Sequence, residues 1–323
     1  MRNLTFRDVT YRLYRLRRLV IVAMLIPMPF IALAIWTGVS VGWWLAAVWI
    51  AFVLIHSVRF PNAWIDQLAM SIGLAILLIL APAFGFIGLG PIIGYPLAMI
   101  AWFVIWMSLI GQITRLDGVP FRREKFVLRR RSKLSPAEMR AAFFLRPNAQ
   151  VGFHLCHEAD ENGVFMVEPQ GISTIGFQLG DDFATDQTDD QSDSECAALS
   201  QDFTPDFNFF ATILESDETH QETVVLTNAT DDESEANVTS MIETITPAKN
   251  GAIYEKREYY DKFTLLAGLG FWLQDYNADH FTATIDHVSG KPARALRSAP
   301  KDSLLTLLAN WFISRRLSRI EQA

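Results

Sequence analysis

The sequence predicts a membrane protein in which four transmembrane helices precede an α+β domain, an antiparallel sheet wrapped on a long C-terminal helix. Two stretches predict the membrane part: Leu19–Val58, 40 residues, and Gln67–Thr114, 48 residues, contain no Asp, Glu, Lys or Arg. A bilayer core takes about 20 helical residues, so each stretch is long enough to cross twice. The third observation is the short runs of alternating polar and apolar residues after Leu134, which are typical of strands.

The four helices are expected as two hairpins, and Gly and Pro residues around position 88 separate the last two. Their expected ranges are Leu19–Thr37, Val41–Val58, Gln67–Phe86 and Ile92–Ile113. None of them carries an acidic or basic residue at mid-membrane, which disfavours an ion pump or carrier. His56 lies near the inner end of the second helix, where we expect an interfacial, non-catalytic role.

Charge bias predicts the orientation, because Lys and Arg accumulate in loops that stay cytoplasmic. Met1–Arg18 carries six Arg, and Arg115–Lys133 carries eight Lys and Arg, whereas the two hairpin tips carry none. Both termini are therefore expected inside. After Lys133 the chain carries 13 Lys and Arg against 31 Asp and Glu, and this acidic body argues against nucleic-acid binding.

Five segments follow from these patterns. They are a basic N-terminus at 1–18, the four-helix membrane domain at 19–114, a basic juxtamembrane segment at 115–133, a soluble domain at 134–290 and an amphipathic tail at 291–323, which could lie on the membrane or pack on protein. In the juxtamembrane segment the residues that could contact anionic headgroups are Arg122, Arg123, Arg129, Arg130 and Arg131. Simple topological anchoring is the alternative interpretation, and Phe126–Lys133 could also form the first strand.

The soluble domain is expected to begin with a short helix and to continue as a sheet. Ser135 with Glu138 forms a capping-box pattern ahead of a helix over Pro136–Phe144. The expected strands are Val151–Cys156, Val164–Glu168, Ile172–Leu179, Phe207–Leu214, Thr223–Thr230, Asn237–Thr246 and Ile253–Tyr260, with hairpin turns at Asp160–Gly163 and Asn250-Gly251. One long helix is expected from Asp261 to about Val288.

Two further segments are defined by composition. Asp181–Glu195 contains seven acidic residues and no Gly, which predicts a mobile loop, and calcium binding there lacks the required Gly and terminal Glu spacing. Cys156 and Cys196 are the only cysteines, and a cytoplasmic location predicts free thiols.

The strands VVLTNAT, ANVTSMIETITP and AIYEKREYY, followed by the helix KFTLLAGLGFWLQDYNADHFTATIDHVSG, resemble the end of the START-like, polyketide-cyclase-type helix-grip (SRPBCC) superfamily. Among its members the chain is similar to uncharacterised bacterial membrane-anchored proteins, which implies the bacterial inner membrane. The resemblance covers about half of the chain, Phe126 to Gly290. It implies a curved antiparallel sheet around the helix, with an apolar cavity between them that holds lipids, sterols or aromatic polyketides in various members. The acidic insertion and the membrane helices depart from the superfamily pattern.

With that resemblance, the expected function is non-enzymatic binding of an apolar or lipid-like ligand, with membrane lipids as further partners. The expected cavity residues are Tyr260, Leu269, Trp272, Leu273, Tyr276 and His280. Two alternatives stay open. One is a membrane-anchored cyclase or hydrolase that uses the carboxylates of the last helix, and the other is a scaffold that recruits a basic partner through Asp181–Glu195.

No cofactor, metal or catalytic group is expected from motifs. His154, Cys156 and His157 in HLCH offer zinc ligands, but on a strand His157 points away from the other two. Gly268-Leu-Gly270 lacks the third Gly of a dinucleotide loop. The chain also contains no G-x-S-x-G and no H-E-x-x-H.

Overall fold

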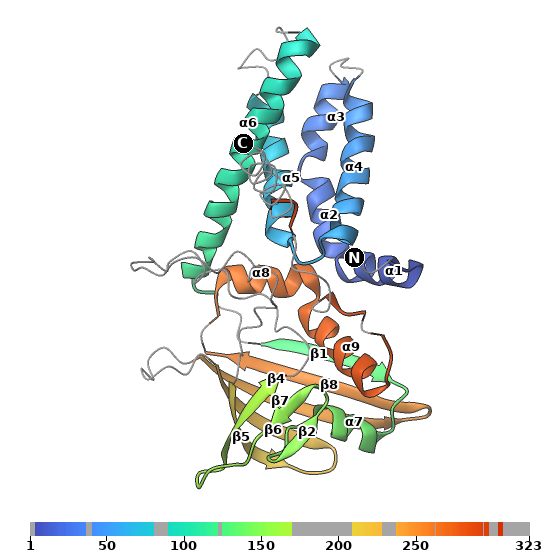
Figure 1. Ribbon diagram of the computed structural model, residues 1–323, viewed down its shortest axis with the longest axis vertical. Coiled ribbons are helices and arrows are strands. Elements are labelled where there is room, and N and C mark those ends of the chain that lie inside the picture. The colour runs from blue at the N-terminus through green and yellow to red at the C-terminus, as the bar shows by residue number, and fades with distance from the viewer. Residues whose placement is uncertain are drawn as a thin grey trace, which may run out of the picture. The chain divides into compact units, whose positions relative to one another are not determined.

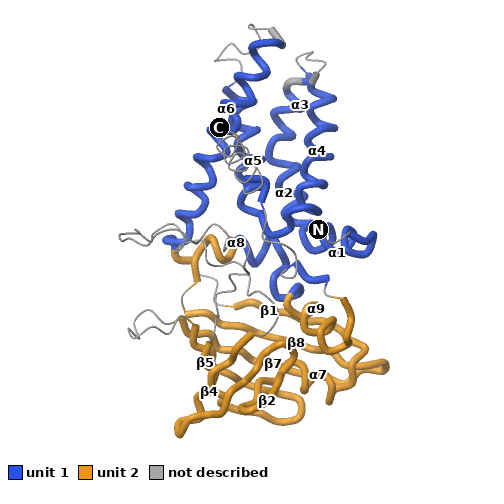
Figure 2. Tube along the Cα trace, viewed as in Figure 1, with its two compact units in different colours: residues 1–119, 269–279, 294–323 blue, residues 120–268, 280–293 orange. Residues whose placement is uncertain are grey.

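The computed structural model describes residues 4–36, 41–80, 90–121, 125–169, 209–227, 237–261, 263–292, 294–296 and 303–305. It divides into two compact units (Figure 2). The first, the helical unit, comprises 1–119, 269–279 and 294–323, and the second, the sheet unit, comprises 120–268 and 280–293.

The helical unit is built from apolar helices. Their bounds are α1 Phe6–Arg15, α2 Arg17–Leu25, α3 Met28–Trp36, α4 Val41–Arg59, α5 Trp64–Leu80 and α6 Gly90–Thr114, followed by the 3-10 turn η1 Arg115–Gly118 (Figure 1). Indole groups tie neighbouring helices together. Trp49 Nε1 donates to the carbonyl of Ala23 at 3.1 Å, and Trp102 Nε1 donates to that of Met70 at 3.2 Å.

Two described helices are long and apolar enough to cross a membrane, Gly42–Arg59 and Ile92–Gly118. A third span results only if α1 and the helix that follows it, which bend by 66°, count as one. α5 is apolar but has 17 described residues, and the expected continuation of this helix to Phe86 lies outside the described residues. The membrane character of the unit is thus supported, while the count of four spans stays a prediction.

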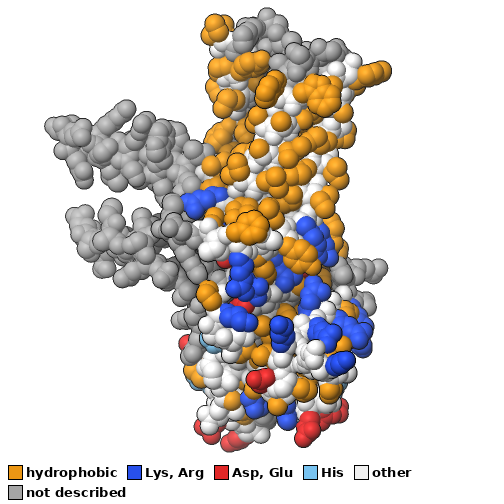
Figure 3. Space-filling view, turned by 90° about the vertical axis from the view of Figure 1, so that its right-hand side faces the viewer, with side chains coloured by type: hydrophobic (Ala, Val, Ile, Leu, Met, Phe, Trp, Pro, Cys, Tyr) orange, Lys and Arg blue, Asp and Glu red, His pale blue; other side chains and the backbone are white. Residues whose placement is uncertain are grey.

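On the face shown in Figure 3, hydrophobic side chains cover most of the upper part of the helices, and Lys and Arg side chains gather lower down. Among the exposed side chains of the helical unit are Leu33, Trp36, Trp43, Trp44, Ile55, Ile92, Met99 and Val104. Water-exposed proteins rarely carry apolar surface on this scale, so these side chains favour a lipid environment.

The sheet unit is an α+β domain with one eight-stranded antiparallel sheet of order β1-β8-β7-β6-β5-β4-β3-β2. Its strands are β1 Phe126–Ser132, β2 Ala149–Val151, β3 His154–Cys156, β4 Val164–Pro169, β5 Phe209–Ser216, β6 His220–Thr227, β7 Asn237–Ala248 and β8 Gly251–Tyr260. Helix α7, Pro136–Phe143, contacts β7 and β8. The Ser135 capping box that starts it is present, as expected.

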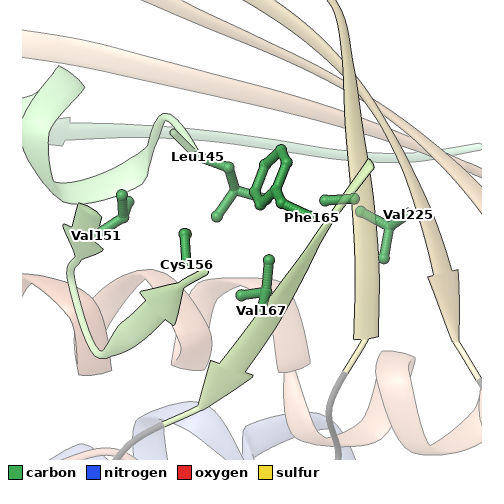
Figure 4. Close-up of a cluster of buried hydrophobic side chains, with 7 residues drawn as sticks. Leu145, Val151, Cys156, Phe165, Val167 and Val225 are labelled. Carbon is green, nitrogen blue, oxygen red and sulfur yellow. The ribbon is translucent and has the colours of Figure 1, made fainter. Parts of the chain in front are cut away.

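One face of the sheet, here called the inner face, packs against α7 and the last helix. Phe143 of α7 and Phe281 of that helix both stack on Tyr254, at ring centroid distances of 4.4 and 5.6 Å. Towards β2–β5 the core is apolar, with Leu145, Val151, Cys156, Phe165, Val167, Ala211 and Val225 buried together (Figure 4). Cys156 is a free thiol there, and burial raises the pKa of this thiol. Cys196 lies outside the described residues.

The long C-terminal helix expected from Asp261 is instead two helices, α8 Leu265–Gln274 and α9 Tyr276–Val288. Asp275 between them has φ +52°, a left-handed conformation that ends one helix. Its carbonyl accepts hydrogen bonds from the amides of Ala278 and Asp279 and so begins the next. The prediction of one continuous helix was therefore wrong.

A second correction concerns the strand expected over Val151–Cys156, which is a tight hairpin of β2 and β3. Gly152 turns the chain with φ +57°. The expected hairpin joins β7 to β8, but its turn residues are Lys249 and Asn250, one position earlier than expected, and Gly251 begins β8 with φ +118°. A Cβ at this position would collide with the carbonyl oxygen of Ser132, so only Gly fits.

The remaining expectations have mixed outcomes. The alternative of a first strand over Phe126–Lys133 is confirmed over Phe126–Ser132, where β1 pairs with β8. The strand expected over Ile172–Leu179, the acidic loop Asp181–Glu195 and nearly all of the amphipathic tail lie outside the described residues.

Candidate functional site

The six residues expected to line one cavity are divided between the two units. Leu269, Trp272, Leu273 and Tyr276 belong to the helical unit, whereas Tyr260 and His280 belong to the sheet unit. Their joint role stays a prediction.

In the helical unit, Trp272 is 42% exposed, and Arg18 donates to its carbonyl at 2.9 Å. Leu273 is buried, and Tyr276 packs on Phe271 with ring centroids 4.3 Å apart.

In the sheet unit, Tyr260 packs on Phe263 at 4.7 Å and His280 on Phe153 at 5.3 Å. Each ring therefore contributes to aromatic packing.

The basic residues expected to contact headgroups are partly described. Arg122 and Arg123 lie outside the described residues. Arg129 and Arg131 are exposed on the outward side of β1, and Arg129 Nε lies 4.0 Å from a carboxylate oxygen of Glu255. Arg130 projects to the opposite side of this edge strand. Basic residues also protect an edge strand from pairing with other chains, so both roles fit their position.

The helix carboxylates of the enzyme alternative serve structural contacts in the helical unit. Asp275 accepts from Arg15 at 3.1 Å and from Arg17 at 3.3 Å. Asp279 accepts from the hydroxyl of Tyr11 at 2.8 Å and from the amide of Leu296 at 2.9 Å. These contacts disfavour catalysis by the two carboxylates.

The sheet unit contains a pocket of about 340 Å³ beside α7. Glu138, Gln150 and His287 are among its lining residues, and none of the six expected cavity residues is. Hydrogen bonds from Ser135 hold the pKa of Glu138 below its usual range. The Glu138 carboxylate at this pocket is therefore part of the capping box that begins α7.

A different set of side chains forms the most unusual polar feature of the sheet unit. We call it the inner polar row: Gln221 and Thr223 of β6, Glu243 of β7, and Tyr254, Lys256 and Glu258 of β8. The strand register brings its members together, because Glu243 lies directly opposite both Gln221 and Lys256. Directly opposite side chains are about 5 Å apart at Cβ, so the row crosses three strands on the inner face.

Charged members of the row are paired within the sheet. Lys256 Nζ lies 2.6 Å from Glu258 Oε1, and the two side chains are 13% and 6% exposed. The Tyr254 hydroxyl donates to Glu243 Oε1. Burial raises the pKa of Glu243, and the positive charge of Lys256 opposes this rise. Burial and the nearby Glu243 carboxylate raise the pKa of Tyr254 well above its usual value.

Three oxygen atoms of the row have no hydrogen-bond partner among the residues that the structure describes, namely Gln221 Oε1, Thr223 Oγ1 and Glu243 Oε2. Gln221 and Thr223 are 0% exposed and Glu243 is 3% exposed. A buried acceptor without a partner costs about 1–3 kcal/mol. Most buried polar atoms in folded proteins have a partner, which can be protein or ordered water, so these three atoms mark a place where a further group could bind.

Sequence reasoning missed the inner polar row. The signal was present as Tyr254, Lys256 and Glu258 at alternate positions of one expected strand. Which of the two alternating sets faces inward depends on the register with β1 and β7, and the strand alone does not determine that register.

The raised pKa of Glu243 predicts a pH dependence of stability. A carboxyl group whose pKa is raised by folding stabilises the fold while it is protonated, so this contribution is lost as pH rises from the unfolded value of 4.5 through the folded value. Relative to the wild type, Glu243→Gln should gain stability as pH rises above about 4.5. The unfolding midpoint of the two proteins, compared from pH 4 to pH 8, measures this difference, and parallel curves would contradict it.

Comparison with known proteins gives matches among solved structures only. No family model matches it, and no curated protein shows a significant match. Among solved structures it is similar to protein CV1439 from Chromobacterium violaceum, with 13% identity and a TM-score of 0.32 over 52% of this chain and 95% of that one. It is also similar to a protein from Rhodobacter sphaeroides, with 10% identity and a TM-score of 0.28 over 52% of this chain and 87% of that one. Both are structural-genomics targets, and likenesses this weak carry no argument about function.

Proposed function

We propose that this chain is an integral membrane protein whose sheet unit is a START-like domain that binds a ligand with an apolar body and a polar end that donates hydrogen bonds. Binding is non-enzymatic in this proposal. Gln221 Oε1 and Thr223 Oγ1 carry it, because both atoms are buried, lie on the same face of β6, can accept a hydrogen bond and have no partner among the described residues.

The surroundings of the row suit an apolar ligand body. Phe143, Phe281 and Phe126 lie on the same side of the sheet and pack on Tyr254 and Tyr260. Ligand sites in proteins combine mostly apolar walls with a few well-placed polar groups. A hydroxyl or an amine at one end of a lipid-like molecule meets both requirements.

Ordered water is the competing occupant, since buried water commonly satisfies isolated polar atoms. Mass spectrometry of lipids extracted from the detergent-purified full chain distinguishes the two. We expect a co-purifying or exchangeable lipid. A chain that neither carries nor exchanges any lipid would contradict the proposal and leave water as the occupant.

A paired variant locates the ligand. Gln221→Met with Thr223→Val removes two acceptors and keeps both members of the Lys256–Glu258 ion pair. It also removes the hydrogen bond that Gln221 Nε2 donates to the carbonyl of Leu145 at 2.9 Å, so circular dichroism checks that the fold is retained. Because an unmet hydrogen bond costs about 1–3 kcal/mol and 1.4 kcal/mol is a factor of ten, retention should fall about tenfold or more. Thr246→Val, at an exposed position of β7, is the matched control and should retain the wild-type amount.

The proposed topology has four spans, both termini inside and the sheet unit in the cytoplasm of a bacterial cell. It rests on the charge bias and on the apolar helices. A protease added outside intact cells should leave a tag on Ala323 uncut, and should cut it once the membrane is permeabilised. Cleavage in intact cells would contradict this orientation.

Both alternatives have less support. Asp275 and Asp279 of the helix are committed to contacts with Arg15, Arg17 and Tyr11, which weakens the cyclase or hydrolase. The scaffold depends on Asp181–Glu195, which lies outside the described residues.

A further inference from the structure

The outer end of the β5–β6 hairpin brings together three side chains that ligate metals. They are Glu215 of β5 and His220 and Glu222 of β6, and one ligand atom from each lies within 4.8 Å of the others. His220 and Glu222 alternate with the buried Gln221 and so project from the face opposite the inner polar row. This cluster is therefore separate from the proposed ligand site.

A break in the strand register places the two carboxylates opposite each other. Ile213 pairs with Thr223, and after an irregularity Glu215 pairs with Glu222 and Ser216 with Gln221. A regular ladder would instead place Glu215 opposite Gln221. Like charges directly opposite each other destabilise a sheet, and bulges often re-aim a side chain at a functional site.

No neighbouring group offsets this repulsion in the described part of the chain. The Glu215 and Glu222 carboxylates and the His220 ring make no hydrogen bond and no salt bridge among the residues that the structure describes. The backbone at His220 is held, because Asp217 accepts hydrogen bonds from the amides of Thr219 and His220 at 2.6 and 2.7 Å. His220 also interacts electrostatically with Asp217, so the imidazole lies near three carboxylates and makes no hydrogen bond to Glu215 or Glu222 in the described part of the chain.

We propose that Glu215, His220 and Glu222 bind a divalent zinc ion, with water completing the coordination. One imidazole and two carboxylates are good zinc ligands, and a site with three protein ligands leaves a position for water. Imidazole in the set favours zinc over magnesium and calcium, which take oxygen ligands. Zinc bonds of about 2.0–2.2 Å put neighbouring ligand atoms about 3.3 Å apart. The side chains reach that spacing by rotation, because all three are partly or fully exposed.

Zinc titration of the untagged full chain in detergent tests the proposal. We expect one equivalent of zinc to bind in the presence of excess magnesium. His220→Gln and Glu222→Gln should each weaken that binding at least tenfold, in line with the loss of one of three ligands. Circular dichroism of each variant checks that the fold is retained.

His157→Gln is the matched control. His157 also faces a glutamate across a strand pair, with Nε2 3.3 Å from Glu168 Oε2, and belongs to the HLCH segment. Its replacement should leave the affinity for zinc unchanged. The proposal is overturned if no equivalent binds, if His220→Gln and Glu222→Gln bind as the wild type does, or if only His157→Gln loses the ion.

Discussion

Lys256→Met should destabilise the sheet unit by about 3–5 kcal/mol. The substitution removes the only cation of the inner polar row, and replacing one member of a buried ion pair typically costs about 3–5 kcal/mol. Glu258, at 6% side-chain exposure, would keep its negative charge, and Glu243 would lose the cation that opposes the rise of its pKa. Hydrogen exchange of the β7 and β8 amides in the detergent-solubilised chain measures the loss.

A double variant separates the ion pair from simple packing. Lys256→Met with Glu258→Leu removes both charges, and replacing a whole buried pair with apolar side chains is often neutral. Most of the lost stability should return. Arg257→Met is the control, because the exposed side chain of Arg257 pairs with Glu255 on the other face. It should change the free energy of unfolding by less than about 1 kcal/mol. A double variant as unstable as the single one would contradict this account of the row.

Asp275→Ala should destabilise the helical unit by about 3–5 kcal/mol. It removes the carboxylate that Arg15 Nη1 contacts at 3.1 Å, and the Arg15 side chain is only 8% exposed. It also places Ala at φ +52°, a left-handed conformation that costs about 1–2 kcal/mol for residues other than Gly, Asn and Asp. Hydrogen exchange of the α1 and α8 amides reports the effect.

Two further replacements at this position divide the effect into its parts. Asp275→Gly removes the backbone strain but does not restore the ion pair. It should therefore still destabilise the helical unit, but by about 1–2 kcal/mol less than Asp275→Ala does. Asp275→Asn keeps an acceptor and tolerates the backbone, so it should cost least. Asp117→Ala in the exposed η1 turn is the control, expected within about 0.5 kcal/mol. Equal losses for Ala, Gly and Asn would show that neither the strain nor the ion pair matters.

Local signals in the sequence predicted the fold well wherever structure is decided locally. The capping box at Ser135 starts α7, and the hairpin expected at Asn250-Gly251 joins β7 to β8. The apolar stretches also form helices. Each of these features depends on residues within a few positions of each other, so a single sequence carries the information.

The sequence did not predict features that depend on distant partners. The break at Asp275 is held by Arg15 and Arg17, some 260 positions away, and nothing near Asp275 marks it as an end of a helix. Gly152 was the one local signal for the β2–β3 hairpin, and an isolated Gly also fits a strand.

The candidate site was missed for the same reason. Aromatic and apolar residues of the last helix pointed to a cavity, whereas Glu243, Lys256 and Gln221 come together only through strand register. The zinc cluster likewise depends on an irregularity at Glu215. Register and bulges are set by the whole sheet, which the alternation of one strand does not show.

The most direct test of the central claim is photo-cross-linking of the full chain with a long-chain alkyl amine that carries a diazirine on its chain. The account predicts labelled peptides from the inner face, in 139–145, 221–227 and 241–258, and loss of this labelling in the Gln221→Met, Thr223→Val protein. Labelling confined to the apolar helices at 41–59 and 90–114, unchanged in that variant, would contradict it, because the amine would then be acting only as a membrane lipid.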